Sequence, residues 1–461
     1  MLQDRYETDK FFEEIAEQSI KIDPVLAQID VLLEDEELYQ MMRKDFASRY
    51  PQTEVTGRKS TPVAVLLRML TVKRLYGLSY EQTEYQVRDS LVLRQFCRVY
   101  FEAVPDDTTL LRWANLIEAE TLEAYNWRVT QLATELKVTR GRKLRTDGTV
   151  VETNIHAPSD SRLLADSVRV IGRSLQRAKQ LLSEQTDLGR QVFRNRNRSA
   201  KKIARQIQRL VARQTEARKQ AYRKLVQITK QSVAQAKQVL EELQESHPEP
   251  VQRLKETLET FVSRAEQVIE QTVRRVFQDE KVPASEKIVS IFEPHTAIIR
   301  RGKASKPVEY GRKVWLDEVE GGIVTRWQVL VGNPSDKLQW KPSLDAHQQR
   351  FGKPPTQASA DRGVFSADNE AEARRQGIQR VVLPKPGKKS EKRRQLERQP
   401  WFRKARKWHA GVEGRISVLK RCYQLDRCLN HGENGFQLWV GWGVIAHNLK
   451  KIGSTLAARS A

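Results

Sequence analysis

Three acidic residues lie in segments where their carboxylates could bind divalent metal ions. Asp147 precedes Gly148, whose missing side chain leaves room for an ion or a phosphate. Asp361 ends a short run of small residues, and Glu413 lies in a helical pattern nearer the C-terminus. Carboxylates that hold two metal ions roughly 3.5–4 Å apart can stabilise the attacking and leaving oxygens of a phosphoryl transfer. Taken singly, an Asp before Gly is more typical of a turn, and a Glu among arginines of a surface ion pair.

The elements around these acids are predicted to form a mixed sheet with helices. Alternating apolar and polar residues flank Glu320-Gly321-Gly322, which indicates a hairpin. The predicted strands are 143–152, 308–319, 322–331, 357–361 and 380–384, and the predicted helices are 338–347, 368–376 and 401–420. This order is that of a ribonuclease-H-like mixed β-sheet core in an α+β protein. One acid then lies on the first strand, one on the fourth strand and one on the last helix.

The charge balance points to a polyanionic partner, of which nucleic acid is the commonest. The 461 residues contain 81 Lys and Arg against 58 Asp and Glu, a formal net charge of +23. Two tracts concentrate this charge: residues 190–230 hold 14 basic residues against one acid, and residues 385–407 hold 11 against two. Residues 1–56 are acidic instead, with 14 acids against 6 basic residues.

Several classes of protein are excluded by composition. Only three cysteines occur, without a CxxC pair, which argues against a disulfide framework and against a cysteine-based zinc site. The first twenty residues lack an apolar signal region, and no later stretch approaches the roughly 18 apolar residues of a membrane span. We therefore expect a cytoplasmic protein with no membrane partner.

The N-terminal third is predicted to be all-helical. Apolar residues at spacings of three and four run from residue 65 to 75, and Ser79 with Gln82 makes a capping box for a following helix. A third helix is expected after Pro105. Three short helices with tight turns would suit a helix-turn-helix-like DNA-binding unit, and a packing or dimerisation domain fits them equally well.

A long basic insertion is predicted between the first strand and the next. Heptad-like apolar spacing on both sides of His247-Pro248 indicates an antiparallel helical hairpin over residues 161–287. A coiled coil used for dimerisation is the alternative to a DNA-gripping arm. We favour the arm, because its crowded positive charges would repel one another without a polyanion. The expected DNA contacts in it are Arg194, Arg198, Lys201, Lys202 and Arg205.

Three segments together carry a family resemblance. TDGTVVETNIH (146–156), ADRGVFS (360–366) and GVEGRISVLK (411–420) resemble the catalytic motifs of DDE transposases encoded by bacterial insertion sequences. The chain resembles the ISNCY group more closely, related to the IS-five-like superfamily, and the likeness runs from about residue 58 to 449. The expected organisation is an acidic helical segment (1–57), a helical DNA-binding or dimerisation domain (58–138), a ribonuclease-H-like catalytic domain (139–160 and 288–450), the basic hairpin (161–287) and a C-terminal tail (451–461).

The resemblance implies roles for particular residues. Asp147, Asp361 and Glu413 would be the catalytic triad and bind two Mg²⁺ or Mn²⁺ ions. The residues expected to contact DNA near the reacting phosphate are Arg362, His409, Arg415, Lys420 and Arg421, and those expected to support the metal ligands are Asn154 and His156. Related transposases often carry Tyr and Arg seven and four positions before the Glu, where this chain has Arg406 and His409. The phosphate-holding role then falls to His409, Arg403 or Arg406.

The implied function is transposition in the bacterial cytoplasm, in association with the nucleoid. The protein would bind the terminal inverted repeats as a homodimer, cleave the element ends and join the freed 3′-OH to double-stranded target DNA. Two alternatives stay open at this stage. One is a catalytically inactive DNA-binding protein derived from a transposase, and the other is a ribonuclease-H-like structure-selective nuclease.

Overall fold

The computed structural model describes residues 1–19, 21–49, 57–182, 194–211, 213–243, 249–300 and 307–460. The chain forms two compact units. One combines Met1–Asn154 with Arg312–Ala461, and the other is Ile155–Gly311. The domain boundaries expected from the sequence stay a prediction.

The first unit contains a mixed, open sheet whose strands are largely those predicted. Their bounds are β1 (Lys143–Thr153), β3 (Val308–Val319), β4 (Ile323–Val329), β5 (Gln357–Ser359), β6 (Arg380–Val382) and β7 (Arg427–Cys428). The order β3-β1-β5-β6 runs across the sheet, with β4 beside β3 and β7 beside the end of β1. β1, β5 and β6 are parallel neighbours, whereas β3 and β4 form the predicted antiparallel hairpin.

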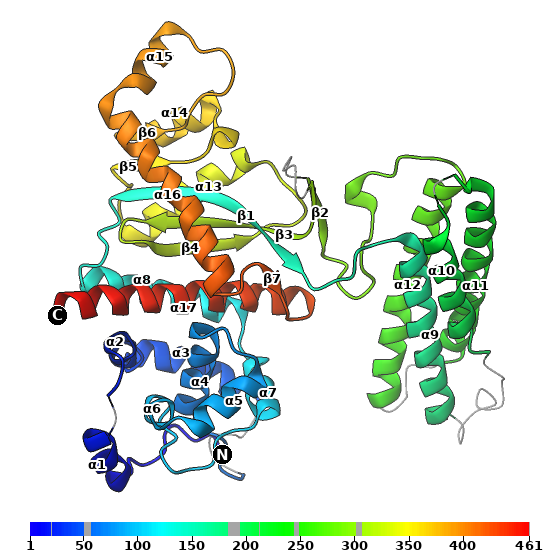
Figure 1. The fold of residues 1–461 in the computed structure, drawn as a ribbon, viewed down its shortest axis with the longest axis horizontal. Coiled ribbons are helices and arrows are strands. Elements are labelled where there is room, and N and C mark those ends of the chain that lie inside the picture. Colours follow the sequence, from blue (N-terminus) through cyan, green and yellow to red (C-terminus); the bar gives the residue numbers. More distant parts are fainter. Residues whose placement is uncertain are drawn as a thin grey trace. The chain divides into compact units, whose positions relative to one another are not determined.

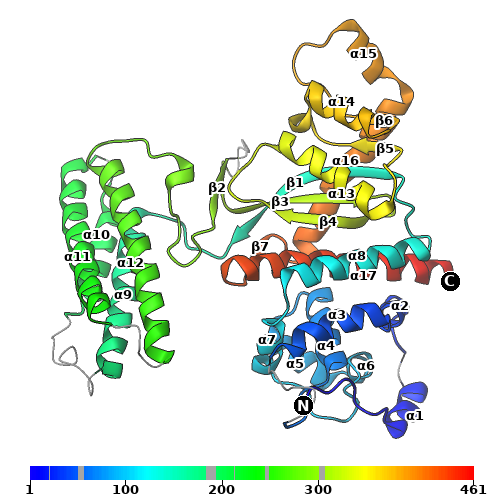
Figure 2. The same ribbon diagram turned by 180° about the vertical axis from the view of Figure 1, so that it is seen from behind.

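Helices cover both faces of this sheet. α16 (Pro400–Cys422) crosses one face, and α13 (Trp340–Phe351) lies on the other, as the two opposite views show (Figures 1 and 2). α14 (Ala367–Arg375) and α15 (Glu391–Arg398) connect β5, β6 and α16. The predicted order of three strands, helix, strand, helix, strand and helix is confirmed for these elements. The two-residue β7 and the short α15 were not predicted, because neither has enough residues to show a period.

The N-terminal helices share one apolar core with the sheet, except the first, whose Phe12 and Ala16 pack in a separate small cluster with Tyr100. They are α1 (Lys10–Ser19), α2 (Pro24–Leu32), α3 (Glu36–Ala47), α4 (Val63–Leu75), α5 (Tyr80–Asp89), α6 (Leu91–Phe96), α7 (Asp107–Ala114) and α8 (Ala119–Glu135). The long α17 (Gly432–Ser460) packs against α2, α4, α8 and β4, so it joins these helices to the sheet. The predicted capping box is confirmed: the Ser79 hydroxyl accepts from the Gln82 amide at 3.0 Å, and the Ser79 amide donates to Gln82 Oε1 at 2.9 Å.

In its described residues, the second unit is built on four α-helices rather than on the predicted hairpin. They are α9 (Asp160–Leu182), α10 (Asn197–Arg209), α11 (Thr215–Glu242) and α12 (Glu249–Val276), and their apolar faces enclose one core. The prediction of a two-armed hairpin is therefore wrong. It counted 203–228 as one arm, but the helix ends at Arg209 and a new one begins at Thr215, and it overlooked the apolar face of α9. The expected turn at His247-Pro248 lies outside the described residues.

A short hairpin closes the second unit. β2 (Ala297–Arg300) pairs antiparallel with the first four residues of β3, from Ala297 opposite Gly311 to Arg300 opposite Val308. No helix in the described residues combines the length and apolar character that crossing a membrane requires.

Buried histidines predict how the fold responds to acid. His347 on α13 is buried, its Nε2–H donates to the Gly141 carbonyl at 3.0 Å, and burial lowers its pKa to about 4 from the ordinary 6.5. The unfolded chain therefore takes up a proton on this ring at a pH where the folded chain does not.

We expect the free energy of unfolding to fall as the pH drops from about 6.5 towards 4. His347→Gln should remove part of this slope, which urea denaturation at stepped pH measures. Equal slopes for the two proteins across that window would contradict the assignment.

Candidate catalytic site

The parallel pairing of β1 and β5 stops just before Asp147, which lies in the middle of β1, and before Asp361, which follows β5, so both aspartates lie at this edge of the paired segments. Arg145 of β1 lies opposite Ser359 of β5, the last paired residue of that strand. Each aspartate is two residues beyond its member of this pair, and Asp361 keeps an extended backbone with φ −71° and ψ 168°. Side chains two residues apart in a strand point to the same face. The two carboxylates therefore share an edge and a face, Asp147 half-buried and Asp361 exposed.

The helix that carries Glu413 covers this same face. α16 packs against β1, β5 and β6, and its buried residues are Phe402, Ala405, His409, Val412 and Leu419. His409 lies close enough to Asp361 for the carboxylate charge to affect its pKa. Glu413 is exposed and follows His409 by one helical turn, so it lies on the same side of α16.

A buried carboxylate fixes α16 to the sheet. Glu318 of β3 is 1% exposed and accepts two hydrogen bonds from Arg145 of β1, at 2.9 Å to Nε and 2.6 Å to Nη2. Arg415 of α16 donates from Nε to the same carboxylate at 3.2 Å. One carboxylate thus joins the strand of Asp147, the neighbouring strand and the helix of Glu413.

The backbone of α16 is adapted to the Arg145 side chain. Arg145 Nη1 donates to the Trp408 carbonyl, and its guanidinium lies 4.8 Å from the centre of the Trp408 ring. A Cβ at Gly411 would come within 2.6 Å of Arg145 Nη1, so glycine lets the helix approach this closely. Because of its bond to Glu318, Arg415 is largely buried rather than directed at solvent.

His409 is a neutral buried side chain. Burial lowers its pKa to about 4, although Asp361 opposes the shift and Arg145 adds to it. Its Nδ1 atom is buried without a hydrogen-bond partner among the described residues. At neutral pH the ring can hold a hydrogen bond but cannot attract a phosphate by charge.

The other residues expected at this site differ in their surroundings. Arg362 and Arg421 are exposed and Lys420 is half-buried, so their side chains reach the surface. Asn154 lies just beyond the end of β1, seven residues after Asp147, which is roughly 23 Å along an extended strand. That separation does not fit a supporting role at Asp147. His156 is exposed and belongs to the other unit.

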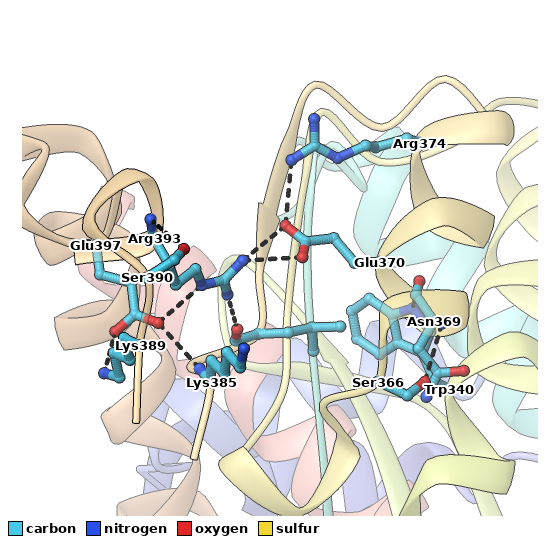
Figure 3. A network of polar contacts seen from close by, with 11 residues as sticks. Trp340, Ser366, Asn369, Glu370, Arg374, Lys385, Lys389, Ser390, Arg393 and Glu397 are labelled. Atoms are coloured by element: carbon cyan, nitrogen blue, oxygen red, sulfur yellow. Dashed lines mark hydrogen bonds and ion pairs between the residues drawn. The ribbon is translucent and has the colours of Figure 1, made fainter. Parts of the chain in front are cut away.

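An ion-pair network positions the second basic tract. Buried Arg393 of α15 makes two hydrogen bonds to Glu370 of α14, at 2.9 and 2.8 Å, and one to Glu397 at 2.9 Å (Figure 3). Lys389 pairs with Glu397 at 2.5 Å. The charges of Arg393 and Lys389 are therefore paired within the protein. The tract still has exposed side chains at Lys388, Lys392, Arg394, Arg398, Arg403, Lys404, Arg406 and Lys407.

The first basic tract forms an exposed face on α10 in the other unit. Ala200, Ala204 and Ile207 are buried against neighbouring helices. The opposite side is a basic groove lined in part by Arg198, Lys201, Lys202 and Arg205. Arg194 precedes the helix and is also exposed. None of these cations forms an ion pair with another described residue, so the face keeps its positive charge for an external partner.

Within the described ranges, no three His, Cys, Asp or Glu side chains form a group that could hold a metal ion. The structure brings Asp147 and Asp361 to one edge and sets α16 over it. Sequence reasoning missed Arg145 and Glu318, which position that helix. Both strands carry several other polar and charged residues, so nothing in the sequence distinguishes these two.

We expect Glu318→Gln to cost roughly 3–5 kcal/mol of unfolding free energy, because it leaves two arginines without their buried carboxylate. Asp345→Asn is the control, since it breaks an exposed ion pair with Lys341 and should cost less than about 1 kcal/mol. Urea denaturation of the three proteins measures both. Similar costs for the two variants would show that Glu318 does not fix α16.

Two family models match parts of the chain. Residues 14–116, which hold α2 to α7, match the model described as Transposase domain (DUF772). Residues 369–453, which hold α16 with Glu413, match the model described as Transposase DDE domain. No curated protein and no solved structure gave a match. The two matched segments, which together cover less than half of the chain, support a relation to insertion-sequence DDE transposases.

Proposed function

We propose that the protein is a DNA transposase of the ISNCY group with a ribonuclease-H-like catalytic domain. It binds the terminal inverted repeats of its insertion sequence, cleaves DNA at the element ends and transfers the 3′-OH strand to target DNA. The register of β1 and β5 is the observation that carries this proposal. It supports two aspartates on neighbouring strands, Asp147 in the middle of β1 and Asp361 just beyond β5, below the helix whose glutamate lies in the matched DDE segment.

The chemistry of the three acids fits divalent metal ions. Asp147, Asp361 and Glu413 would hold two Mg²⁺ or Mn²⁺ ions, which prefer carboxylate oxygens. Neither Asp361 nor Glu413 forms an ion pair with another described residue, so both carboxylates are available. When bound, such ions stabilise the attacking and leaving oxygens of phosphoryl transfer.

The chain's own residues orient the DNA around these acids. Arg362 follows Asp361 directly, and Lys420 shares a helix face with Glu413, so each can contact a phosphate beside the scissile bond. Arg421 extends this positive surface. Arg415 acts through Glu318 instead, and keeps α16 in place. In each of the two steps an oxygen nucleophile, first water and then the freed 3′-OH, attacks phosphorus in line.

The two basic tracts supply DNA affinity. The exposed cations of α10 and of residues 385–407 bind phosphates without reading sequence. Because transposition joins two ends, we propose a homodimer in the complex with DNA. Such a protein acts in the bacterial cytoplasm, on the nucleoid.

A cleavage and joining assay tests the catalytic site. A labelled duplex from the element end is incubated with plasmid target and Mg²⁺ or Mn²⁺, and EDTA provides the metal-free arm. Asp361→Asn and Glu413→Gln should each slow end cleavage by at least about 10²-fold, because metal-held charge stabilisation contributes several kcal/mol. Both should bind the end duplex as the unsubstituted protein does.

Asp368→Asn is the matched control, an exposed acid on α14 outside the proposed triad. It should cleave normally. Full cleavage by Asp361→Asn would overturn the site. Metal-dependent cutting without joined product would favour the structure-selective nuclease. Binding of the duplex without cleavage, both with metal ions and with EDTA, would favour an inactive derivative.

The basic face of α10 is tested by the salt dependence of DNA binding. Lys202→Gln should lower the slope of log K against log salt by about 0.9, the value for one phosphate contact. Lys281→Gln removes one exposed charge elsewhere in the same unit and should leave the slope unchanged. Equal slopes for both variants would place DNA elsewhere.

A further inference from the structure

Two neighbouring cations on α4 are buried without a carboxylate partner among the described residues. Arg74 is 3% exposed, its Nη1 donates to Gln424 Oε1 at 3.0 Å, and its Nη2 donates to the Trp439 carbonyl at 2.6 Å. Its guanidinium lies 4.1 Å from the centre of the Trp439 ring, and its buried Nε has no hydrogen-bond partner among the described residues.

Lys73, the preceding residue, is 9% exposed. Its ammonium lies 4.4 Å from the centre of the Tyr80 ring and 5.6 Å from that of Trp439. In the part of the chain that the structure describes, neither Lys73 nor Arg74 forms an ion pair. Burial lowers the pKa of Lys73 to about 8 and that of Arg74 to about 9.

Another buried arginine on the same helix shows the usual arrangement. Arg68 is 2% exposed and pairs with both Asp30 and Glu34. A buried charge that lacks such partners costs free energy unless a ligand compensates it. The contrast within one helix singles out Lys73 and Arg74 as cations that need an external anion.

The two cations line a small pocket with a polar and aromatic rim. Tyr80, Asn430 and Trp442 are its half-buried members, and they come from the start of α5, the segment before α17, and α17 itself. The Lys73 ammonium has three donors, and the Asn430 amide has one besides the N–H that donates to the Gly435 carbonyl at 3.3 Å, which suits the several oxygens of a phosphate. The aromatic rim can pack on a sugar.

We propose that this pocket binds one phosphate group of the DNA backbone. The DNA assignment rests on the proposed function, whereas the phosphate assignment rests on the pocket alone. It gives the segment matched as a transposase domain a specific phosphate contact, held at its junction with α17.

The first experiment uses inorganic phosphate as the probe. The thermal midpoint of the protein is compared in sodium phosphate and in sodium chloride of equal ionic strength. Phosphate should raise the midpoint in a saturable way for the unsubstituted protein and for Lys73→Arg, which keeps the charge. Lys73→Met keeps the bulk of the side chain without the charge and should lose the phosphate shift.

Folding of Lys73→Met is checked in the chloride buffer. Because the substitution removes a buried unpaired charge, its midpoint there should equal or exceed that of the unsubstituted protein. Lys44→Met is the matched control: Lys44 is an exposed lysine in the last turn of α3. It should keep the phosphate shift.

The second experiment measures binding of the end duplex across a range of salt concentrations. Lys73→Met should lower the slope of log K against log salt by about 0.9 relative to Lys44→Met. A phosphate shift with an unchanged slope would identify free phosphate as the ligand and overturn the DNA assignment. A phosphate shift that survives in Lys73→Met, or none in any variant, would overturn the pocket itself. Neither result depends on cleavage, so failure of the proposed function is seen separately.

Discussion

The Glu318 carboxylate is the contact on which the candidate site depends, because it is shared by two arginines from different elements. Arg145 belongs to β1, two residues before Asp147, and Arg415 belongs to α16, two residues after Glu413. Because the cluster is buried, loss of the carboxylate would leave each arginine as an uncompensated charge in an apolar interior, at a large cost in free energy. A shift of α16 along the sheet would break these bonds, so the position of Glu413 relative to β1 follows from a buried ion pair rather than from its own contacts.

The buried cations of the first unit have two kinds of surroundings. We assign a structural role to one kind and a binding role to the other. Arg145, Arg68 and Arg393 are each matched by carboxylates, and each ties two or more elements together. Lys73 and Arg74 have aromatic rings and carbonyl groups as neighbours instead. Aromatic faces attract a cation only weakly in comparison with a buried carboxylate. Because the other buried arginines of this unit are paired and these two cations have no carboxylate partner among the described residues, the contrast supports an anion that arrives from outside.

Local patterns in the sequence predicted most elements of the first unit, but they could not predict which elements pair in the tertiary structure. The β3 strand over 308–319 and the Ser79 capping box follow from residues that are close in sequence, and both are confirmed. The pairing of Arg145 with Glu318 spans 173 residues, so nothing local links them. The four-helix unit was mistaken for a hairpin because heptad spacing describes one apolar face and does not say how many helices share it. The acids of the candidate site were found because their types and order are visible in sequence, while their common edge depends on the register of β1 and β5.

The position of the basic unit in the chain explains how a large insertion leaves the sheet intact. The chain leaves after β1 and returns through β3, and these two strands are hydrogen-bonded neighbours. The ends of the insertion are therefore fixed by strands that pair in any case, so loop closure adds little further entropy cost as the insertion grows. The inserted helices bury their apolar faces on one another, which leaves the cations of α10 at the surface. A dense positive face could not be built on the strands of the candidate site themselves, because those strands are buried on both sides. Because the basic face lies in a unit with its own core, its exposed cations do not have to be accommodated beside the carboxylates of the candidate site.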